Sequence, residues 1–143
     1  MLYNPASATL IDRVQELIDP TGDHKGIGLA PIGHMAMVRT AHIVTVNIST
    51  ELTFVGGFTW EMLREQVTTL MDAYMLELRQ DRENILTPLG LFENPLIIMI
   101  SQVNSRILGV HGIVDIQNTQ INRRADNPEI NKYSIPMLGV ISV

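Results

Sequence analysis

The amino-acid sequence predicts an α+β fold, with a small mixed or antiparallel sheet and helices packed mainly on one of its faces. Residues 43–54 alternate between apolar and polar side chains, which is typical of a strand with one buried face. Residues 59–80 carry apolar side chains at helical spacing, and two further apolar runs, 113–121 and 135–143, indicate strands. At 143 residues the chain has the size of one ordinary domain, so we expect residues 1–143 to form a single α+β domain around one core.

The first predicted element is a helix that begins near Asn4-Pro5. Asparagine is a favoured N-cap, and proline is tolerated at the first helical position. Asp19-Pro20 ends the helix, because a residue before proline avoids helical backbone angles. Residues 21–33 contain four glycines and a proline, which predicts an irregular connection. The apolar stripe of the helix consists of Leu10, Ile11, Val14, Leu17 and Ile18.

The alternating strand and the long helix after it are expected to cover each other. The strand would be about 40 Å long at about 3.3 Å per residue, and this length predicts a bulge or a bend. Gly56-Gly57 turns the chain, Thr59 stands at an N-cap position, and Phe58 and Leu63 are spaced for a hydrophobic staple. The helix extends to about Gln80, with an apolar stripe of Leu63, Val67, Leu70, Met71, Tyr74 and Leu78.

The second half of the chain predicts a loop, a short helix and two strands. Residues 81–95 mix charges, two prolines and a glycine, so we expect a long loop whose apolar residues invite a partner. The run 96–100 fits a strand or a helix; the spacing up to Leu108 favours a helix that ends at Gly109 as a left-handed cap. Residues 122–134 predict a solvated loop between the last two strands. The apolar residues of the first loop are Ile85, Leu86, Leu89, Leu91 and Phe92.

Composition excludes several classes of function. Cysteine is absent, so a disulfide framework, a thiolate nucleophile and a cysteine-based zinc site are impossible. The formal net charge of -5 opposes general affinity for nucleic acid. No run approaches the roughly 18 to 20 apolar residues of a membrane-spanning helix, so no membrane contact is expected. Charged residues between Met1 and Pro20 argue against a signal-peptide core.

The sequence predicts no catalytic, cofactor-binding or metal site. His24, His34, His42 and His111 lack the spacing of a helical ligand pair. Residues 19–28 faintly suggest a calcium or phosphate loop, yet they lack the terminal glutamate of the first and the Gly-Lys-Ser/Thr ending of the second. No serine lies in a GxSxG context. The carboxylates fall mostly on exposed helix positions, where a solvated face is the ordinary explanation.

Several remaining residues each allow two interpretations. Trp60 either caps the core or anchors a partner. Arg123-Arg124 either pairs with a neighbour's carboxylates or carries surface charges that contribute little. The methionines fill core gaps or form adaptable contact surfaces, and we expect core positions for Met71 and Met99 more than for Met75, which lies off the main stripe of its helix.

An ordered series of short motifs resembles a known family. GLAPIGH at 28–34 precedes the long strand, and LREQVTTLMDAYMLELR lies in the long helix. ISQVNSRILGVHGIVDI and a final SIPMLGVISV follow. Together they resemble the C-terminal region of baseplate J-like proteins of contractile phage tails, most closely the PBSX-type prophage version. Residues 35–39 depart from the family's pattern, which continues directly into a strand rich in valine and threonine.

The resemblance implies a structural role without catalysis or cofactors. Such proteins form wedges of the tail baseplate, and they are usually longer, so this chain would be the C-terminal part of a larger baseplate protein. The implied partners are other baseplate and tail proteins, with a homo-oligomer in the assembled ring. The implied locations are the host cytoplasm during assembly and then the virion tail. The alternative from the residues alone is a small α+β ligand-binding or regulatory domain.

Overall fold

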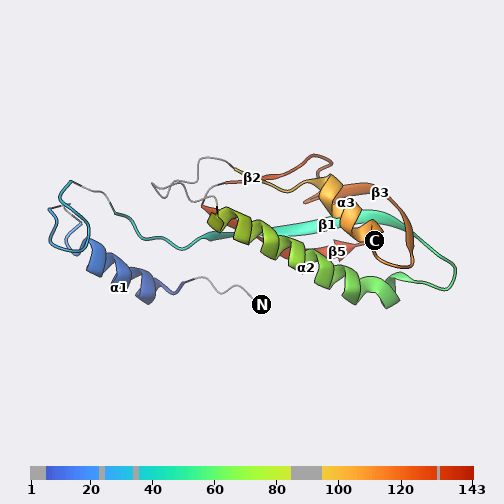
Figure 1. The fold of residues 1–143 in the computed structure, drawn as a ribbon, viewed down its shortest axis with the longest axis horizontal. Helices are drawn as coiled ribbons and strands as arrows, with labels where there is room; N and C mark the ends of the chain where they lie inside the picture. The colour runs from blue at the N-terminus through green and yellow to red at the C-terminus, as the bar shows by residue number, and fades with distance from the viewer. Residues whose placement is uncertain (1–5, 23–24, 34–35, 85–94, 132) are drawn as a thin grey trace. The chain divides into compact units, whose positions relative to one another are not determined.

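The structure, a computed structural model, describes residues 6–22, 25–33, 36–84, 95–131 and 133–143. The chain divides into two units, Met1–His42 and Ile43–Val143, which are described separately below. The described elements follow the order α1, β1, α2, β2, α3, β3, β4, β5 (Figure 1).

In its described residues the first unit contains one helix, α1 (Ala8–Ile18), and residues close to it in the chain cap both of its ends. Ser7 is its N-cap, and the hydroxyl oxygen accepts a hydrogen bond from the backbone N–H of Leu10 at 3.2 Å. Asn4 and Pro5, the predicted start, lie outside the described residues, and the cap is three positions later than expected. A serine side chain can reach the free N–H groups of the first turn, so the hydroxyl at position 7 sets the helix start.

The connection after α1 is irregular, as predicted, and it satisfies the last carbonyls of the helix. The backbone N–H of Leu29 donates to the carbonyl of Leu17 at 3.0 Å, and that of Ala30 donates to Ile18 at 2.9 Å. Gly28 permits this approach, because a Cβ there would collide with the Ile18 carbonyl. Residues 28–30 of the GLAPIGH segment therefore have a local structural role at the end of α1.

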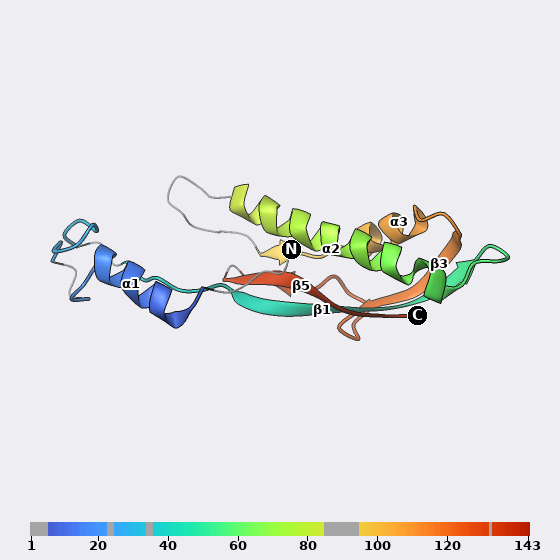
Figure 2. The same cartoon turned by 90° about the horizontal axis from the view of Figure 1, so that it is seen from below.

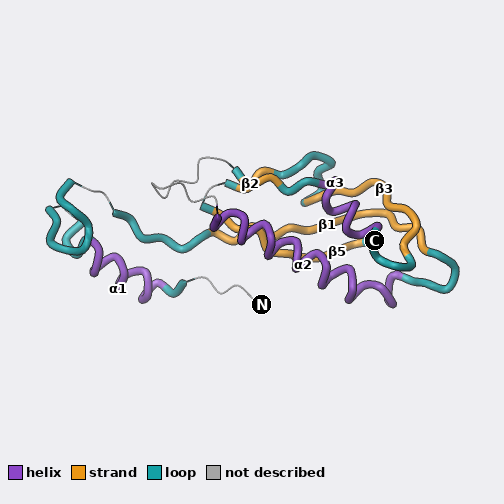
Figure 3. Tube along the Cα trace, viewed as in Figure 1, coloured by secondary structure: helices purple, strands orange, loops and turns teal. Residues whose placement is uncertain are grey.

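The second unit is built on a three-stranded sheet in the order β3-β1-β5 (Figure 3). The central strand, β1 (His42–Phe54), pairs antiparallel with β3 (Ile113–Ile121), and Ile48 lies opposite Ile121. The register shifts between Ser49 and Glu51 and again between Thr53 and Phe54, which confirms the predicted irregularity of this long strand. The third strand is β5 (Ser134–Ser142), as the final apolar run predicts.

Two helices, α2 (Trp60–Asn84) and α3 (Ile100–Leu108), lie on the same face of this sheet (Figure 2). The helix α2 extends four residues beyond the predicted end at Gln80, since residues 81–84 contain no proline or glycine to stop it. The loop predicted for 81–95 is thus helical at its start, and residues 85–94 lie outside the described residues.

A second, two-stranded ladder corrects two predictions. The strand β2 (Leu96–Ile97) pairs antiparallel with β4 (Glu129–Ile130), so a helix from residue 96 is wrong for these two positions. The same pairing shows that the predicted loop 122–134 contains a short strand. Strand pairing forms here instead of helix because it buries Ile130 beside Leu96. Local sequence does not reveal this contact.

The two ends of α3 are capped in different ways, the first by a distant segment and the second by the next residue of the chain. The side-chain oxygen of Asn127 accepts a hydrogen bond from the backbone N–H of Ile100 at 2.9 Å, and so caps the helix from a distant loop. Gly109 is the C-cap, as predicted, but its φ of -72° is right-handed, so the predicted left-handed cap is wrong. Its N–H bonds back to the carbonyls of the preceding turn, which makes a left-handed turn unnecessary.

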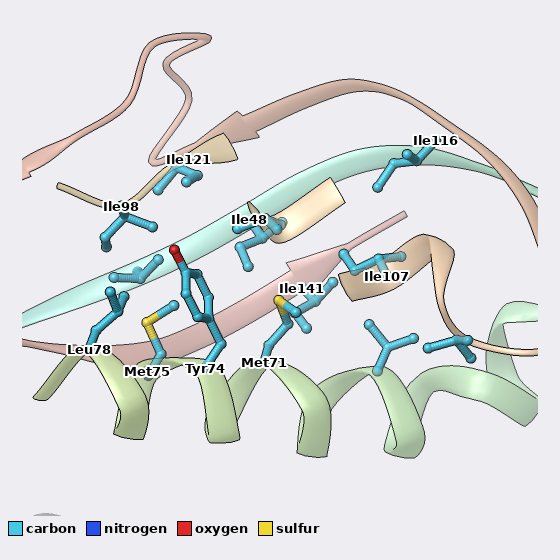
Figure 4. Close-up of a cluster of buried hydrophobic side chains, with 14 of the residues drawn as sticks. Ile48, Met71, Tyr74, Met75, Leu78, Ile98, Ile107, Ile116, Ile121 and Ile141 are labelled. Atoms are coloured by element: carbon cyan, nitrogen blue, oxygen red, sulfur yellow. The ribbon is translucent and has the colours of Figure 1, made fainter. Parts of the chain in front are cut away.

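The core lies between the sheet and the two helices (Figure 4). Val46 and Ile48 from β1 join the apolar stripe of α2 in one buried cluster, as expected for a strand and helix that cover each other. Met75 is fully buried in it, because it lies one turn after Met71 on the same face, so its predicted peripheral position is wrong. Met99 is 45% exposed, since it precedes α3 in an extended conformation, and its predicted core position is also wrong.

The observed layers confirm the predicted α+β class. Trp60 is partly buried and packs against the core cluster, which favours the interpretation that it caps the core. Within the part of the chain that the structure describes, no helix combines the length and apolar character needed to span a membrane. The expectation of a single domain stays a prediction.

Candidate protein-interaction surface

An open groove with a volume of about 750 Å³ lies between α2 and the C-terminal end of α3. It is lined mostly by apolar atoms, and we call it the α2–α3 groove. It is lined by one row of α2, by the last turn of α3 and by the two residues after that helix, namely Met62, Glu65, Gln66, Thr69, Leu70, Ala73, Arg106, Gly109 and Val110.

The groove arises from the second face of α2. The buried row of this helix contains Leu63, Val67 and Met71, which face the sheet. The residues one position earlier or later, such as Met62 and Leu70, lie beside that row and meet α3. Met62 is 62% exposed, so a flexible apolar side chain lies open at the rim. Sequence reasoning missed this surface, although an apolar Met62 next to the core row was a usable signal.

Arg106 fixes α3 against α2 at one end of the groove. Its two terminal nitrogens donate to the carboxylate oxygens of Glu77 at 3.3 and 2.6 Å. Its guanidinium carbon also lies 4.5 Å from the centroid of the Tyr74 ring, in a cation–π contact. The pairing neutralises the one cation of the groove, whereas the carboxylate of Glu65 has no ion-pair partner within the described residues.

Burial is the main effect on the phenol of Tyr74 and raises its pKa above the ordinary value of 10.0. A backbone hydrogen bond at Met99 and the charge of Arg106 lower the pKa, while Glu77 raises it. Because the folded-state pKa lies above the unfolded-state value, the neutral phenol contributes fully below pH 10.0, and this contribution is lost as the pH rises through the folded-state pKa.

We therefore expect Tyr74→Phe to reduce the alkaline loss of stability. Free energies of unfolding from urea titrations between about pH 8 and pH 11 should fall more steeply above pH 10 for the wild type than for the variant. Tyr133→Phe, at an exposed position, should retain the wild-type slope. Parallel curves for the wild type and Tyr74→Phe would contradict the role of the buried phenol.

The sheet face opposite the helices is polar and rich in amides. Asn118 donates to the carboxylate of Glu51 at 3.0 Å, and Gln117 donates to Asp115 at 2.7 Å. Each carboxylate thus has a neutral amide beside it. Such pairs form a hydrogen-bonding surface and do not form an acid–base couple.

Asn122 joins this face at the end of β3. Its backbone N–H donates to the carbonyl of Asn47 at 2.8 Å, and its side-chain oxygen accepts from the N–H of Asn47 at 2.9 Å. Its φ of 51° lies in the left-handed region that asparagine tolerates. The Asn47 side chain in turn accepts from the N–H of Val140 at 2.9 Å, so the two asparagines connect all three strands.

Within the described part of the chain, the residues that could carry chemistry do not converge. His42 and His111 are exposed. The rings of His111 and Phe58 are perpendicular, with their centroids 5.4 Å apart. His24 and His34 lie outside the described residues. Among the residues that the structure describes, no three histidine, aspartate or glutamate side chains are grouped to hold a metal ion. In the 19–28 segment Asp19 is buried, and residues 23–24 lie outside the described residues.

Arg124 pairs with Asp126 in its own loop, through contacts of 2.9 and 2.7 Å. This hydrogen bond lowers the pKa of Asp126. Arg123 is exposed, with a left-handed φ of 65°. The pairing of these arginines with a neighbour's carboxylates stays a prediction.

Most of the second unit matches a known protein family. Residues 46–143 match the family model for the baseplate J-like protein C-terminal domain. The match covers well over half of the chain and falls entirely within the second unit, so it includes the groove and the amide-rich sheet face but not α1. None of the curated proteins matches the chain at a significant level.

Proposed function

The chain belongs to the baseplate J-like protein family through its C-terminal domain, and on that premise we propose that it assembles the baseplate wedge of a contractile phage tail by protein–protein contacts. The family is a structural component of the phage baseplate, and its partners are other tail and baseplate proteins. The family match over the second unit is the observation that carries the proposal. The proposed locations are the host cytoplasm during assembly and the virion tail afterwards.

The α2–α3 groove supports the proposal as a contact surface. It combines a flexible apolar side chain at Met62 with a small residue at Ala73, so a partner's side chains can approach the helix backbone. The groove is open to solvent, which suits a protein segment better than a small molecule that must be enclosed. The net charge of -5 supports protein partners over nucleic acid.

A charge inside the groove should weaken baseplate contacts. We expect Ala73→Glu to reduce the affinity for a partner baseplate protein at least about ten-fold, since a carboxylate would be buried without a counter-ion. The measurement is calorimetric titration against purified products of neighbouring tail-sheath, tube and lysozyme-like baseplate genes. Gln80→Glu introduces the same group at an exposed position of α2 outside the groove and should bind like the wild type.

Two results would argue against this function. Unchanged binding of every baseplate protein by Ala73→Glu would remove the groove from the contact surface. Turnover of a substrate that one polar substitution abolishes would contradict a purely structural role. A tightly co-purifying small molecule, displaced by Ala73→Glu, would instead support the alternative of a ligand-binding or regulatory domain.

A further inference from the structure

The helix α1 presents an apolar ridge that its own unit leaves open. Leu10, Arg13 and Leu17 follow one another at i, i+3 and i+7, so they share one face of the helix. Leu10 is 52% and Leu17 is 65% exposed, and no residue of α1 is buried. We call these three residues the α1 ridge.

The side of α1 away from the ridge is already occupied. The side-chain amide of Gln15 donates to the carbonyl of Ala36 at 3.0 Å and accepts from the N–H of Val38 at 2.8 Å. At 100° per residue, Gln15 and Arg13 point to opposite sides of the apolar stripe. The 36–38 segment is therefore bound along one side of α1, and the ridge remains on the other side.

The α1 ridge and the α2–α3 groove match in chemistry, and the ridge is short enough to lie within the groove. The ridge extends from Leu10 to Leu17, about 10 Å along the helix. The row that lines the groove extends from Met62 to Ala73, which spans about 16 Å along α2. Leucines of an amphipathic helix fit a groove lined mostly by apolar atoms with an adaptable methionine at its rim.

The charges at the two surfaces are complementary. Arg13 and Glu65 are both exposed, and neither has an ion-pair partner among the described residues. Arg106, the cation in the groove, is neutralised by Glu77 and would not repel Arg13. The ridge thus carries one free cation, and the groove carries one free carboxylate.

We propose that the α1 ridge of one copy of this chain docks into the α2–α3 groove of a second copy. The inference rests on the proposed function and names one occupant of the groove. Each chain has one ridge and one groove, so the contact is heterologous and links copies head to tail. Such a contact can close into a ring. Every copy supplies one ridge and one groove, so the two surfaces are present in equal numbers.

The test exchanges the two charges. Sedimentation velocity of the full chain should show association in the range of about 10 to 100 µM, since a single short helix buries a small interface. Arg13→Glu and Glu65→Arg should each weaken association about ten-fold, because the new pairs carry like charges. An equimolar mixture of the two variants should associate like the wild type, since each variant's ridge then meets a groove of opposite charge.

Hydrophobic substitutions provide an independent readout. Leu17→Gln should weaken association about ten-fold or more, because it removes an apolar side chain from the contact. Leu29→Gln, at an even more exposed leucine of the same unit, should leave association unchanged. Both positions are exposed, so neither variant should lose folding, which circular dichroism would verify.

Three outcomes would overturn the inference. They are a wild type that stays monomeric at about 100 µM, a mixture that stays as weak as its components, and equal effects of Leu17→Gln and Leu29→Gln. A monomeric wild type that still binds baseplate proteins through the groove would reject the self-contact alone and leave the proposed function standing. Loss of both activities would reject both.

Discussion

Ile48→Ala should lower the free energy of unfolding by about 3 to 4 kcal/mol, among the largest losses expected from a single truncation in this chain. Ile48 is 1% exposed on the central strand, opposite the equally buried Ile121, and it belongs to the cluster that contains Met71 (Figure 4). Removal of the three outer carbons leaves a cavity that the strand, flanked by neighbours on both sides, cannot close.

Urea titration monitored by circular dichroism would measure this loss. Ser49→Ala is the matched control, because Ser49 is the next residue of the same strand and points to the exposed face. It should change the free energy of unfolding by no more than about 0.5 kcal/mol. Similar effects of the two substitutions would mean that β1 does not bury the face assigned to it.

Gly112→Ala should cost about 3 kcal/mol, for two separate reasons. The backbone of Gly112 has a φ of 103°, which side-chain-bearing residues rarely adopt. A Cβ at this position would also lie 2.7 Å from the ring of Phe58 and 3.1 Å from a methyl group of Leu63. The aromatic ring is part of the packing at the start of α2, so it cannot move away without loss.

Gly57→Ala separates the two contributions. Gly57 has a similar φ of 95°, but nothing lies within 4 Å of its would-be Cβ, so we expect only the backbone cost of about 1 to 2 kcal/mol. The larger loss for Gly112→Ala should shrink when Phe58→Leu is added, because a smaller side chain makes room. Equal losses for the two glycine variants, measured by thermal unfolding, would exclude the collision with Phe58.

Most of the second unit could be predicted because its signals are local. Strict alternation between Ile43 and Phe54 predicts the central strand, and helical spacing after Thr59 predicts α2. Gly112 lies in the ISQVNSRILGVHGIVDI segment that carries the family resemblance, and the tight approach of Phe58 is a physical reason for a glycine there.

The features that could not be predicted depend on residues far apart in the chain. The ladder between Leu96 and Ile130 exists only because two distant segments meet. The N-terminal cap of α3 likewise comes from Asn127, so the residues around Ile100 do not predict where this helix begins. The groove needs α3 to lie against a secondary row of α2, a matter of packing that periodicity along one helix does not encode.

The strand order also constrains how the sheet forms over time. Both neighbours of β1 come from much later in the chain, with Ile48 pairing about 70 positions away. A nascent polypeptide that has produced β1 and α2 therefore exposes an alternating ribbon with two unsatisfied edges until β3 and β5 emerge from the ribosome. Unpaired strand edges can pair with other chains, so this interval exposes the nascent protein to aggregation, and we expect the yield of native protein to depend on temperature and chaperone supply.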